Sequence, residues 1–335
     1  MNILIAGVEL VKKDERYMDD KGWSFKKAFE KIGAKVEIFY YKKKGKLSFV
    51  EKNKKIKEIW HQYMNKALVT HIKNKKPDIF IILKGETISP ETLWLIRKNT
   101  DTIIINIYPD NPLYMSKFEA ILPCHYFFVK DSYILETLHK AGLKNLYYLP
   151  QCTDPDVHKP TEIIKEEKEE YESELSLIGS MYPYREKFIE EIIEFKPAIW
   201  GRGWNKSKNK EIIKLYKGKD IRGIAKAKAI SASKISLNIH HPLNDIHGVN
   251  RRTYDIAGCM GFQLVDYKVD MERVFEINKE IICYRSLDEL KKLIEYYLKH
   301  PEERKEIAKS AYSRVLKSHT YDIRAKQIME IIRKT

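Results

Sequence analysis

The chain has 335 residues, a length typical of about two domains. Its content of 43% hydrophobic and 11% aromatic residues is enough to build substantial cores, which excludes a wholly disordered protein. The net charge of +15 favours anionic partners such as nucleotides, nucleic acid or an acidic membrane surface, although 62 basic residues are mixed with 47 acidic ones along most of the chain.

The first 150 residues alternate β-rich runs with amphipathic stretches, a pattern typical of a parallel sheet covered by helices on both faces. Strands are predicted at 2–6, 35–40, 78–83, 102–107, 126–129 and 146–149. Helices are predicted at 23–32, 49–73, 90–98 and 132–141. Gly33 and Gly142 follow two of these helices, where a glycine commonly ends a helix.

A charged stretch at 161–174 has little apolar periodicity, so we expect a first domain of 1–160 and a second of 161–319. The alternation then restarts, with strands expected at 175–178, 198–200, 235–239, 262–265 and 281–284. Helices are expected at 185–195, 221–230, 249–257 and 271–275, and three more begin at Ser286, Pro301 and Thr320. Two doubly wound α/β domains in one chain predict a binding cleft between them.

A carboxylate follows one strand of the first domain. Asp110 comes just after the strand at 102–107, where it could act as a general base toward an acceptor hydroxyl. The alternative is that Asp-Asn-Pro forms a turn that caps the next helix. Glu86 and Asp131, which follow two other strands, are the next candidates for the base.

Glycine turns follow two strands of the second domain. Gly179 and Ser180 follow the strand at 175–178 and precede Arg185; the glycine either lets a ligand approach the backbone or simply forms a tight turn.

The strand at 198–200 runs into a Gly-x-Gly loop that could hold the edge of a base through its backbone. Trp204 would then stack on the ligand or pack against the protein. The loop comprises Gly201, Arg202, Gly203 and Trp204.

Two arginines, Arg251 and Arg252, fall in the first turn of the helix expected at 249–257. Cations are disfavoured at a helix N-terminus, but a bound phosphate would reverse this because backbone N–H groups, the dipole and the guanidinium groups would act together. Asp255, one turn further on, could accept hydrogen bonds from sugar hydroxyls. The alternative is an ordinary Arg251–Asp255 ion pair. Taken with the rest of the chain, this turn favours an enzyme that uses a phosphorylated donor.

Three histidines, His240, His241 and His247, lie within eight residues. Their spacing matches no familiar metal-ligand motif, so we expect them to line the loop or to donate to phosphate, with no metal bound. The four scattered cysteines contain no CxxC pair, and neither a signal peptide nor an apolar run of membrane-spanning length is found. We therefore expect a cytoplasmic protein that could touch an anionic membrane peripherally, and the Lys/Glu richness is typical of a thermophile.

The run from 249 to 262, VNRRTYDIAGCMGF, resembles the N-x-R-T-[FY]-E-I-x-x-x-G segment of group 1-type glycosyltransferases. More narrowly, it is similar to the spore maturation protein CgeB-like family. The likeness covers most of the chain, is strongest from about 175 to 324 and is weakest before 75. Other segments that match this family are 110–112, 148–155, 177–180, 201–204, 288–290, 300–304 and 319–324.

The resemblance implies a GT-B fold of two Rossmann-like domains, in which the second binds a nucleotide-sugar donor and the helix at 320–335 packs back on the first. By matching position, Arg252 would hold the donor diphosphate, beside Asn250 and Arg251. Asp255 would replace the glutamate that binds the ribose, with a side chain one methylene shorter. Gly261 would allow close packing below the donor. Neither a metal nor a cofactor is implied.

The resemblance and the residues together favour a glycosyltransferase that moves a sugar from a nucleoside diphosphate to a hydroxyl of a polysaccharide, lipid or protein acceptor. One alternative is a nucleotide-sugar epimerase of the same fold. Another is a non-catalytic protein that binds RNA or anionic lipid. Nucleic acid is not expected as a partner, because the basic residues do not gather with aromatics in one strip and no RNA-binding signature occurs.

Overall fold

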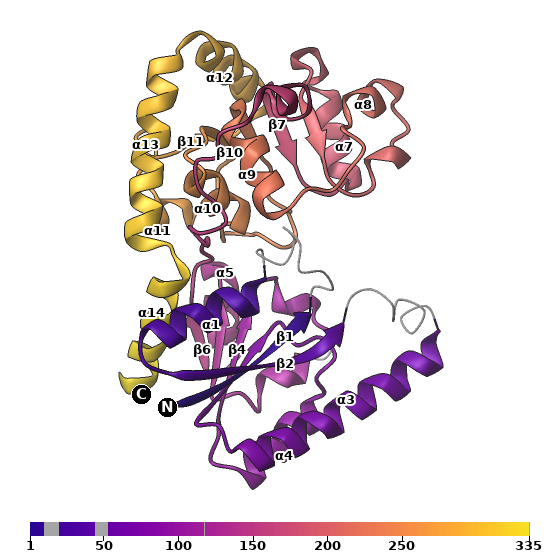
Figure 1. The fold of residues 1–335 in the computed structure, drawn as a ribbon, viewed down its shortest axis with the longest axis vertical. Helices are drawn as coiled ribbons and strands as arrows, with labels where there is room; N and C mark the ends of the chain where they lie inside the picture. The colour runs from indigo at the N-terminus through magenta and orange to yellow at the C-terminus, as the bar shows by residue number, and fades with distance from the viewer. Residues whose placement is uncertain (10–19, 44–52, 117, 335) are drawn as a thin grey trace. The chain divides into compact units, whose positions relative to one another are not determined.

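The structure is a computed structural model that describes residues 1–9, 20–43, 53–116 and 118–334. This part of the chain divides into two compact units, each built around a parallel sheet (Figure 1). Unit 1 comprises 1–150, 243–248 and the C-terminal segment from 321. Unit 2 comprises 151–242 and 249–320.

Unit 1 contains a six-stranded parallel sheet in the order β2-β1-β3-β4-β5-β6. Its strands form because short runs rich in isoleucine and phenylalanine can be buried on both faces; every residue of β3 is buried. The order reverses between β1 and β3, which makes the carboxyl ends of these two strands the switch point of the sheet. The strands are β1 (Asn2–Glu9), β2 (Lys35–Lys43), β3 (Ile79–Leu83), β4 (Ile103–Tyr108), β5 (Tyr126–Val129) and β6 (Leu146–Tyr148).

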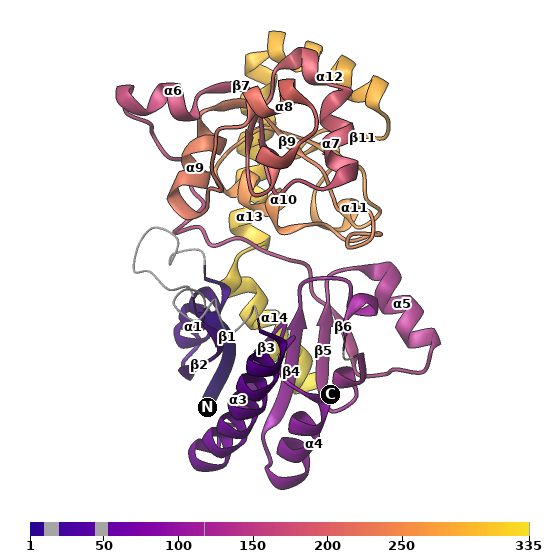
Figure 2. The same cartoon turned by 90° about the vertical axis from the view of Figure 1, so that its right-hand side faces the viewer.

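Helices cover both faces of this sheet (Figure 2). α1 and the C-terminal α14 pack together on one face, where the ring of Phe25 meets that of Tyr321 edge-on at 4.8 Å. α3 and α4 pack against each other on the opposite face. The helices of unit 1 are α1 (Lys21–Lys31), α3 (Lys54–Lys75), α4 (Pro90–Asn99), α5 (Ser132–Lys140) and α14 (Tyr321–Lys334).

Unit 2 contains a five-stranded parallel sheet in the order β11-β10-β9-β7-β8. Its switch point lies between β7 and β9, because the chain moves from β7 to β8 on one side and then returns to β9 on the other. The strands are β7 (Ser173–Ile178), β8 (Ala198–Trp200), β9 (Ser233–Asn238), β10 (Gln263–Asp266) and β11 (Ile282–Tyr284).

Separate cores lie on the two faces of this sheet. The cluster at α7, α8 and α12 includes Ile189, Ile212 and Leu290. A second cluster joins α9 and α10 through Ile230 and Ile256, and a third joins α10, α11 and α13 through residues such as Val315. The helices of unit 2 are α6 (Lys168–Tyr171), α7 (Pro183–Glu190), α8 (Lys210–Leu215), α9 (Gly223–Ser231), α10 (Arg251–Gly258), α11 (Met271–Val274), α12 (Leu287–Lys299) and α13 (Pro301–Ser318).

The predicted fold class, two parallel α/β sheets with helices, is confirmed. Several predicted boundaries were wrong. α8 was missed, and the helix expected at 185–195 ends at Glu190 and is followed by a separate turn. The charged stretch at 161–174 contains the short helix α6. The predicted start of the helix at 49 lies outside the described residues, and α3 begins at Lys54 after the N-cap Asn53. In the described ranges no helix is both long and apolar enough to cross a bilayer.

Candidate functional site

Two guanidinium groups face the glycine that follows β7, at the switch point of unit 2. A Cβ atom on Gly179 would lie 2.5 Å from Nη2 of Arg252 and 3.1 Å from Nη1 of Arg185. Arg252 reaches this place from the first turn of α10, and its Nη1 donates to Oδ1 of Asn238 at 3.2 Å. A side chain at this position would displace the guanidinium groups, so the glycine leaves room for two cations over the backbone at the end of a parallel strand.

Arg185 is held in this position by several contacts, although it is only 4% exposed. Its guanidinium donates to the carbonyl oxygens of Ser180 and, at 3.1 Å, Ile239. It also lies 5.4 Å from the ring centre of Tyr182 and 5.5 Å from that of Tyr184. Contacts of a cation with aromatic faces stabilise its charge where water is largely excluded.

The rings beside Arg185 form a cluster of three aromatic side chains, Tyr182, Tyr184 and His241, which we call the aromatic cluster. The tyrosine rings stack at 5.9 Å, and His241 meets them edge-on at 5.1 and 5.3 Å. Tyr182 is 42% exposed, so it keeps a face that a flat ligand could cover. Sequence reasoning did not single out the two tyrosines; their spacing around Pro183, just before an arginine, was the available signal.

The Gly-x-Gly loop after β8 packs against the backbone of Gly179. Gly201 has a φ of 139°, and a Cβ atom on it would collide with the carbonyl oxygen of Gly179. Trp204 is fully buried in the core, and its indole N–H donates to that carbonyl oxygen at 2.7 Å. Trp204 therefore has no exposed face for stacking; it positions Gly179. The side chain of Arg202 is 71% exposed, 3.6 Å from Asp220.

The first turn of α10 is arranged as the sequence suggests. Asn250 is the N-cap and accepts from the backbone N–H of Thr253 at 3.2 Å, while its side-chain amide donates to Asn238 at 3.0 Å. Gly261 allows α10 to approach α9 closely, since a Cβ atom there would lie 2.5 Å from Cγ2 of Ile230. The bond from Asn250 to Asn238 of β9 fixes the α10 N-terminus against that strand.

Asp255 lies inside the protein, 1% exposed, in a cluster of cationic and polar groups. Its carboxylate accepts from Thr153 Oγ1 at 2.7 Å and from Lys226 Nζ at 2.5 Å, and it lies 3.4 Å from both Arg251 Nε and His158 Nδ1. Burial alone would raise the pKa of Asp255, but Arg251, His158 and Lys226 together hold it far below its ordinary value. Both oxygens already have protein partners, so a bond to a ribose would require Lys226 or Thr153 to move.

His240 is also tied to an acidic partner. Its backbone N–H and Nδ1 both lie within 2.8 Å of Oδ1 of Asp266, and its side chain is buried. Burial raises the pKa of Asp266, but the charge and hydrogen bonds of His240, together with the charge of Lys268, lower it, and the net pKa is below the ordinary value. His247 belongs to unit 1, where its Nδ1 lies 3.2 Å from Ser132 Oγ and its ring 5.3 Å from that of Tyr133.

In unit 1 the predicted base Asp110, which follows β4, forms an ion pair with Lys84, which follows β3. Its Oδ2 lies 2.7 Å from Nζ of Lys84, which also lies 2.8 Å from Glu86. Burial raises the pKa of Asp110, but the charge and hydrogen bond of Lys84, together with the charges of Lys130 and Lys21, lower it, and the net pKa is below its ordinary value. Lys84 has a φ of 68°, a costly conformation for a residue other than glycine, and Tyr41 bonds to both ends of this turn.

The alternative interpretation of Asp110, that Asp-Asn-Pro is a capping turn, holds for its neighbour. Asn111 accepts from the N–H of Leu113 at 3.0 Å and so caps the short helical turn that follows. Asp110 does not make this bond, and its side chain is 39% exposed. A strand-end carboxylate that is ionised, paired with lysine and partly accessible can still accept a proton, although its lowered pKa makes it a weaker base.

Asp131 is a structural residue. One oxygen caps α5 through Ile134, and the other accepts from the backbone N–H groups of Ile246, His247 and Gly248 at 2.7–3.0 Å. Next to it, Lys130 forms a fully buried ion pair with Asp245. Because both oxygens accept hydrogen bonds and Asp131 is 2% exposed, we assign it this structural role and do not propose it as the base.

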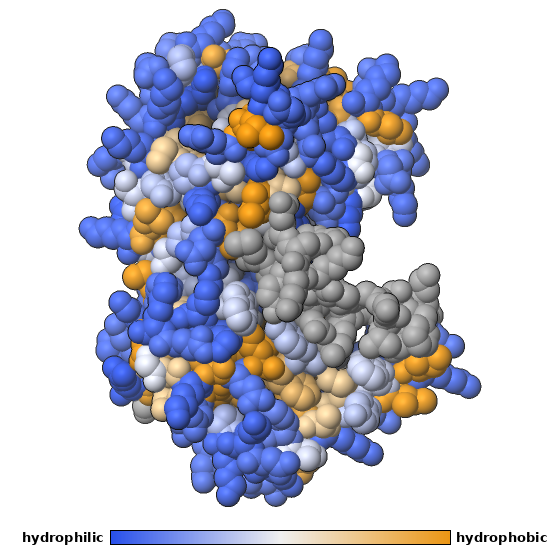
Figure 3. Space-filling model, viewed as in Figure 1, coloured by the Kyte–Doolittle hydropathy of each residue, from blue (hydrophilic) through white to orange (hydrophobic). Residues whose placement is uncertain are grey.

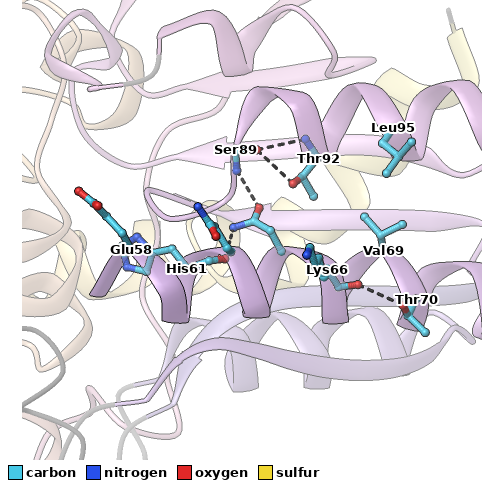
Figure 4. A pocket seen from close by; sticks show the side chains of 10 residues that line it. Glu58, His61, Lys66, Val69, Thr70, Ser89, Thr92 and Leu95 are labelled. Atoms are coloured by element: carbon cyan, nitrogen blue, oxygen red, sulfur yellow. Dashed lines mark hydrogen bonds between the residues drawn. The ribbon is translucent and has the colours of Figure 1, made fainter. Parts of the chain in front are cut away.

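Apart from these residues, unit 1 has a groove of about 660 Å³ between α3 and α4 (Figure 4). Its lining includes the polar side chains of Glu58 and His61 from α3 and of Thr92 from α4. Asn65 bridges its floor, bonding to the backbone of Thr87 and Ser89 at 2.8 and 2.9 Å. In the described ranges no group of three or more histidine, cysteine and acidic residues could hold a metal ion.

Comparisons with known proteins agree with this architecture. Residues 185–330 match the family model described as "Glycosyl transferase-like". Spore protein CgeB of Bacillus subtilis (strain 168) is 25% identical over 265 residues, which cover 74% of this chain and 80% of CgeB. The structure of HepE from Anabaena in complex with UDP-glucose covers 100% of both chains with a TM-score of 0.67 at 10% identity. The catalytic domain of starch synthase IV from Arabidopsis thaliana, bound to ADP and acarbose, covers 99% of this chain and 98% of that one with a TM-score of 0.67 at 9% identity.

These findings confirm the predicted GT-B fold over the full length, the presence of a glycosyltransferase-like domain and a distant likeness to CgeB.

Proposed function

We propose, from the premise that this chain has a GT-B fold and a glycosyltransferase-like domain, that it transfers a sugar from a nucleoside-diphosphate donor to a hydroxyl acceptor. The observation that carries the proposal is the pair of guanidinium groups, Arg185 and Arg252, above Gly179 at the switch point of unit 2. Ligands of doubly wound sheets bind at this place, at the carboxyl ends of the strands. HepE and starch synthase IV, which share the fold, were solved with UDP-glucose and with ADP.

A diphosphate suits this place because the charges act together. The first-turn N–H groups of α10, its dipole and Arg252 would bind one phosphate, and Arg185 would lie beside the other. When the sugar leaves, the negative charge that develops on the diphosphate would be offset by these fixed cations. This is electrostatic stabilisation without a metal ion, which costs no reorganisation during the reaction.

The aromatic cluster supplies the face next to the phosphates. We assign the exposed ring of Tyr182 to contact with the base or the sugar of the donor, since flat or apolar ligand faces pack well on tyrosine. Asp255 is assigned a supporting role: it fixes Arg251 and Lys226 behind the N-terminus of α10. A ribose contact by Asp255 would need that cluster to open.

The acceptor is assigned to unit 1, with Asp110 as the base that takes its proton and Lys84 as the residue that sets the basicity of Asp110. The acceptor would be a polysaccharide, a lipid or a protein. We propose a hexose as the transferred sugar, because HepE was solved in complex with UDP-glucose, a hexose donor.

The test is a donor screen followed by turnover. Titration calorimetry with UDP, GDP and ADP should find one nucleoside diphosphate that binds. A sugar nucleotide that contains this diphosphate should be hydrolysed slowly by the protein alone, and its sugar should be transferred when hydroxyl acceptors are added. Interconversion of two nucleotide sugars without any transfer would replace the proposal with an epimerase. Binding of an RNA oligomer without binding of any nucleoside diphosphate would contradict both.

A further inference from the structure

Helix α3 packs on unit 1 through only one of its sides. Leu68 and Ile72, four residues apart, are buried against the sheet, and the ring of His71 lies 5.6 Å from that of Phe39. On the side that faces away, three large apolar residues are exposed to water: Ile56 (40%), Ile59 (67%) and Tyr63 (61%). The space-filling view shows hydrophobic residues at the surface over the first part of this helix (Figure 3).

The three residues form one row. They occupy positions i, i+3 and i+7, which recur on the same face of an α-helix. The ring of Trp60 borders the row, 5.8 Å from that of Tyr63. Exposed apolar residues that are scattered singly need no explanation, but a row of three along one helix face does.

Lysines run beside this row. Lys55, Lys66 and Lys73 are spaced by eleven and seven residues, which returns to nearly the same angle on the helix, and all three are exposed. Six of the 22 residues of α3 are lysines, and Glu58 is its one acidic residue. We call the apolar row and these three lysines together the α3 face.

We propose that the α3 face docks on an anionic lipid bilayer. A helix that lies in a bilayer interface has an apolar row that enters the headgroup boundary, lysines on the neighbouring flank and aromatic rings at the border, which is the pattern of α3. Charge complementarity selects this occupant: the isoleucines would gain nothing from a nucleic acid, whereas acidic headgroups satisfy the lysines while acyl chains cover the isoleucines.

The position of α3 gives docking a consequence for the acceptor. Asn65, on the inner side of the helix, bonds to the backbone at Thr87 and Ser89, which belong to the same loop as Lys84 and Glu86. A bilayer on the α3 face would therefore lie on the opposite side of α3 from the loop that carries Lys84, the ion-pair partner of Asp110. This consequence rests on the proposed function; docking itself does not.

The test is co-sedimentation of the full chain with vesicles of phosphatidylcholine containing phosphatidylglycerol, compared with vesicles of phosphatidylcholine alone. Ile59→Glu should lower the partition coefficient on the anionic vesicles about 10-fold or more, because a charge would then replace the aliphatic side chain that the bilayer buries on docking. The matched control is Ile164→Glu in unit 2, an isoleucine exposed to a similar degree (61%), which should change the coefficient by less than about twofold.

The lysines are tested separately. Lys55→Gln and Lys66→Gln should each weaken binding to the anionic vesicles about fivefold at low salt and much less at high salt. Lys305→Gln, on an exposed lysine of α13, is their control. Equal losses for Ile59→Glu and Ile164→Glu, or no binding of the wild type to anionic vesicles, would overturn the proposal. So would a wild-type dimer that Ile59→Glu dissociates, since a second copy would then cover the face. Nucleotide binding by Ile59→Glu should stay unchanged, so failure of docking and failure of the proposed function remain distinguishable.

Discussion

Replacing Arg252 with alanine removes the guanidinium that faces Gly179 while leaving its neighbours bonded. Asn238, which accepts from Arg252, keeps its bond from the amide of Asn250, so the local fold should persist. The lost interaction with a phosphate is a charge-assisted hydrogen bond worth about 1.5–3 kcal/mol. At 1.36 kcal/mol per factor of ten, the dissociation constant for the nucleoside diphosphate should rise about 10- to 150-fold.

The assay is calorimetry with the nucleoside diphosphate and with the matching nucleoside. Because the guanidinium would act on phosphate, the loss should appear with the diphosphate and not with the nucleoside. Arg252→Lys keeps the charge but loses the forked pair of N–H groups, so its affinity should fall between those of wild type and alanine. The control is Arg314→Ala on α13, which removes the ion pair between Arg314 and Glu280. This variant should leave the affinity within about twofold of wild type. An unchanged affinity for Arg252→Ala, or an equal loss for the nucleoside, would refute the reasoning.

Asp110→Asn should lower turnover at least about 100-fold, the scale of general base catalysis, and leave the dissociation constant of the donor unchanged; normal turnover would place the base elsewhere. Lys84→Met should shift the acidic limb of the pH–rate profile to higher pH, because burial then raises the pKa of Asp110 without the opposing lysine; an unmoved limb would show that Asp110 does not set it. Asp255→Asn should lower the free energy of unfolding by about 3 kcal/mol at pH 7, because Lys226 and Arg251 lose the buried carboxylate that offsets their charges. The control Asp220→Asn, which removes the ion pair with Arg222, should lower it by under about 1 kcal/mol. The pKa of Asp255 is lowered in the folded state, so its contribution is complete above about pH 4 and is lost as the pH falls further; chemical unfolding at several pH values should show a weaker acid dependence for Asp255→Asn than for the wild type.

The sheets could be predicted from the sequence because their strands are buried on both faces. A run such as 79–83, which is short and entirely apolar, is typical of a strand that is buried on both faces of a parallel sheet. Short polar helices could not be predicted in the same way. α8 buries only Ile212 among its six residues, so it has no apolar periodicity that a sequence pattern could detect.

The site was predictable where its residues are close in the sequence. The first-turn position of Arg251 and Arg252 follows from local helix rules, although α10 starts at Arg251, after the N-cap Asn250, and not at 249 as predicted. The partners of Asp255 could not be predicted, because Thr153 lies 102 residues away and Lys226 lies 29 residues away. The sequence also could not decide whether Trp204 stacks on a ligand or packs inside the protein, because its burial depends on how the loop packs against the core.

Lys84 shows the same limit in unit 1. Lys84 and Asp110 are brought together because β3 and β4 are neighbours in register, with Ile79 opposite Ile103. The sequence contains both residues at strand ends, but the pairing of the two strands decides which of several strand-end charges meet. The Lys84-Gly85 dipeptide, in which both residues have positive φ, was the local signal of an unusual turn.

The central claim is that the switch point of unit 2 binds the diphosphate of a sugar nucleotide. A crystal structure with the nucleoside diphosphate that binds best tests it most directly. We expect a phosphate oxygen within about 3 Å of the Arg252 guanidinium and of a first-turn N–H of α10. A diphosphate bound elsewhere, with Gly179 and Arg252 left in contact with bulk water, would contradict the claim.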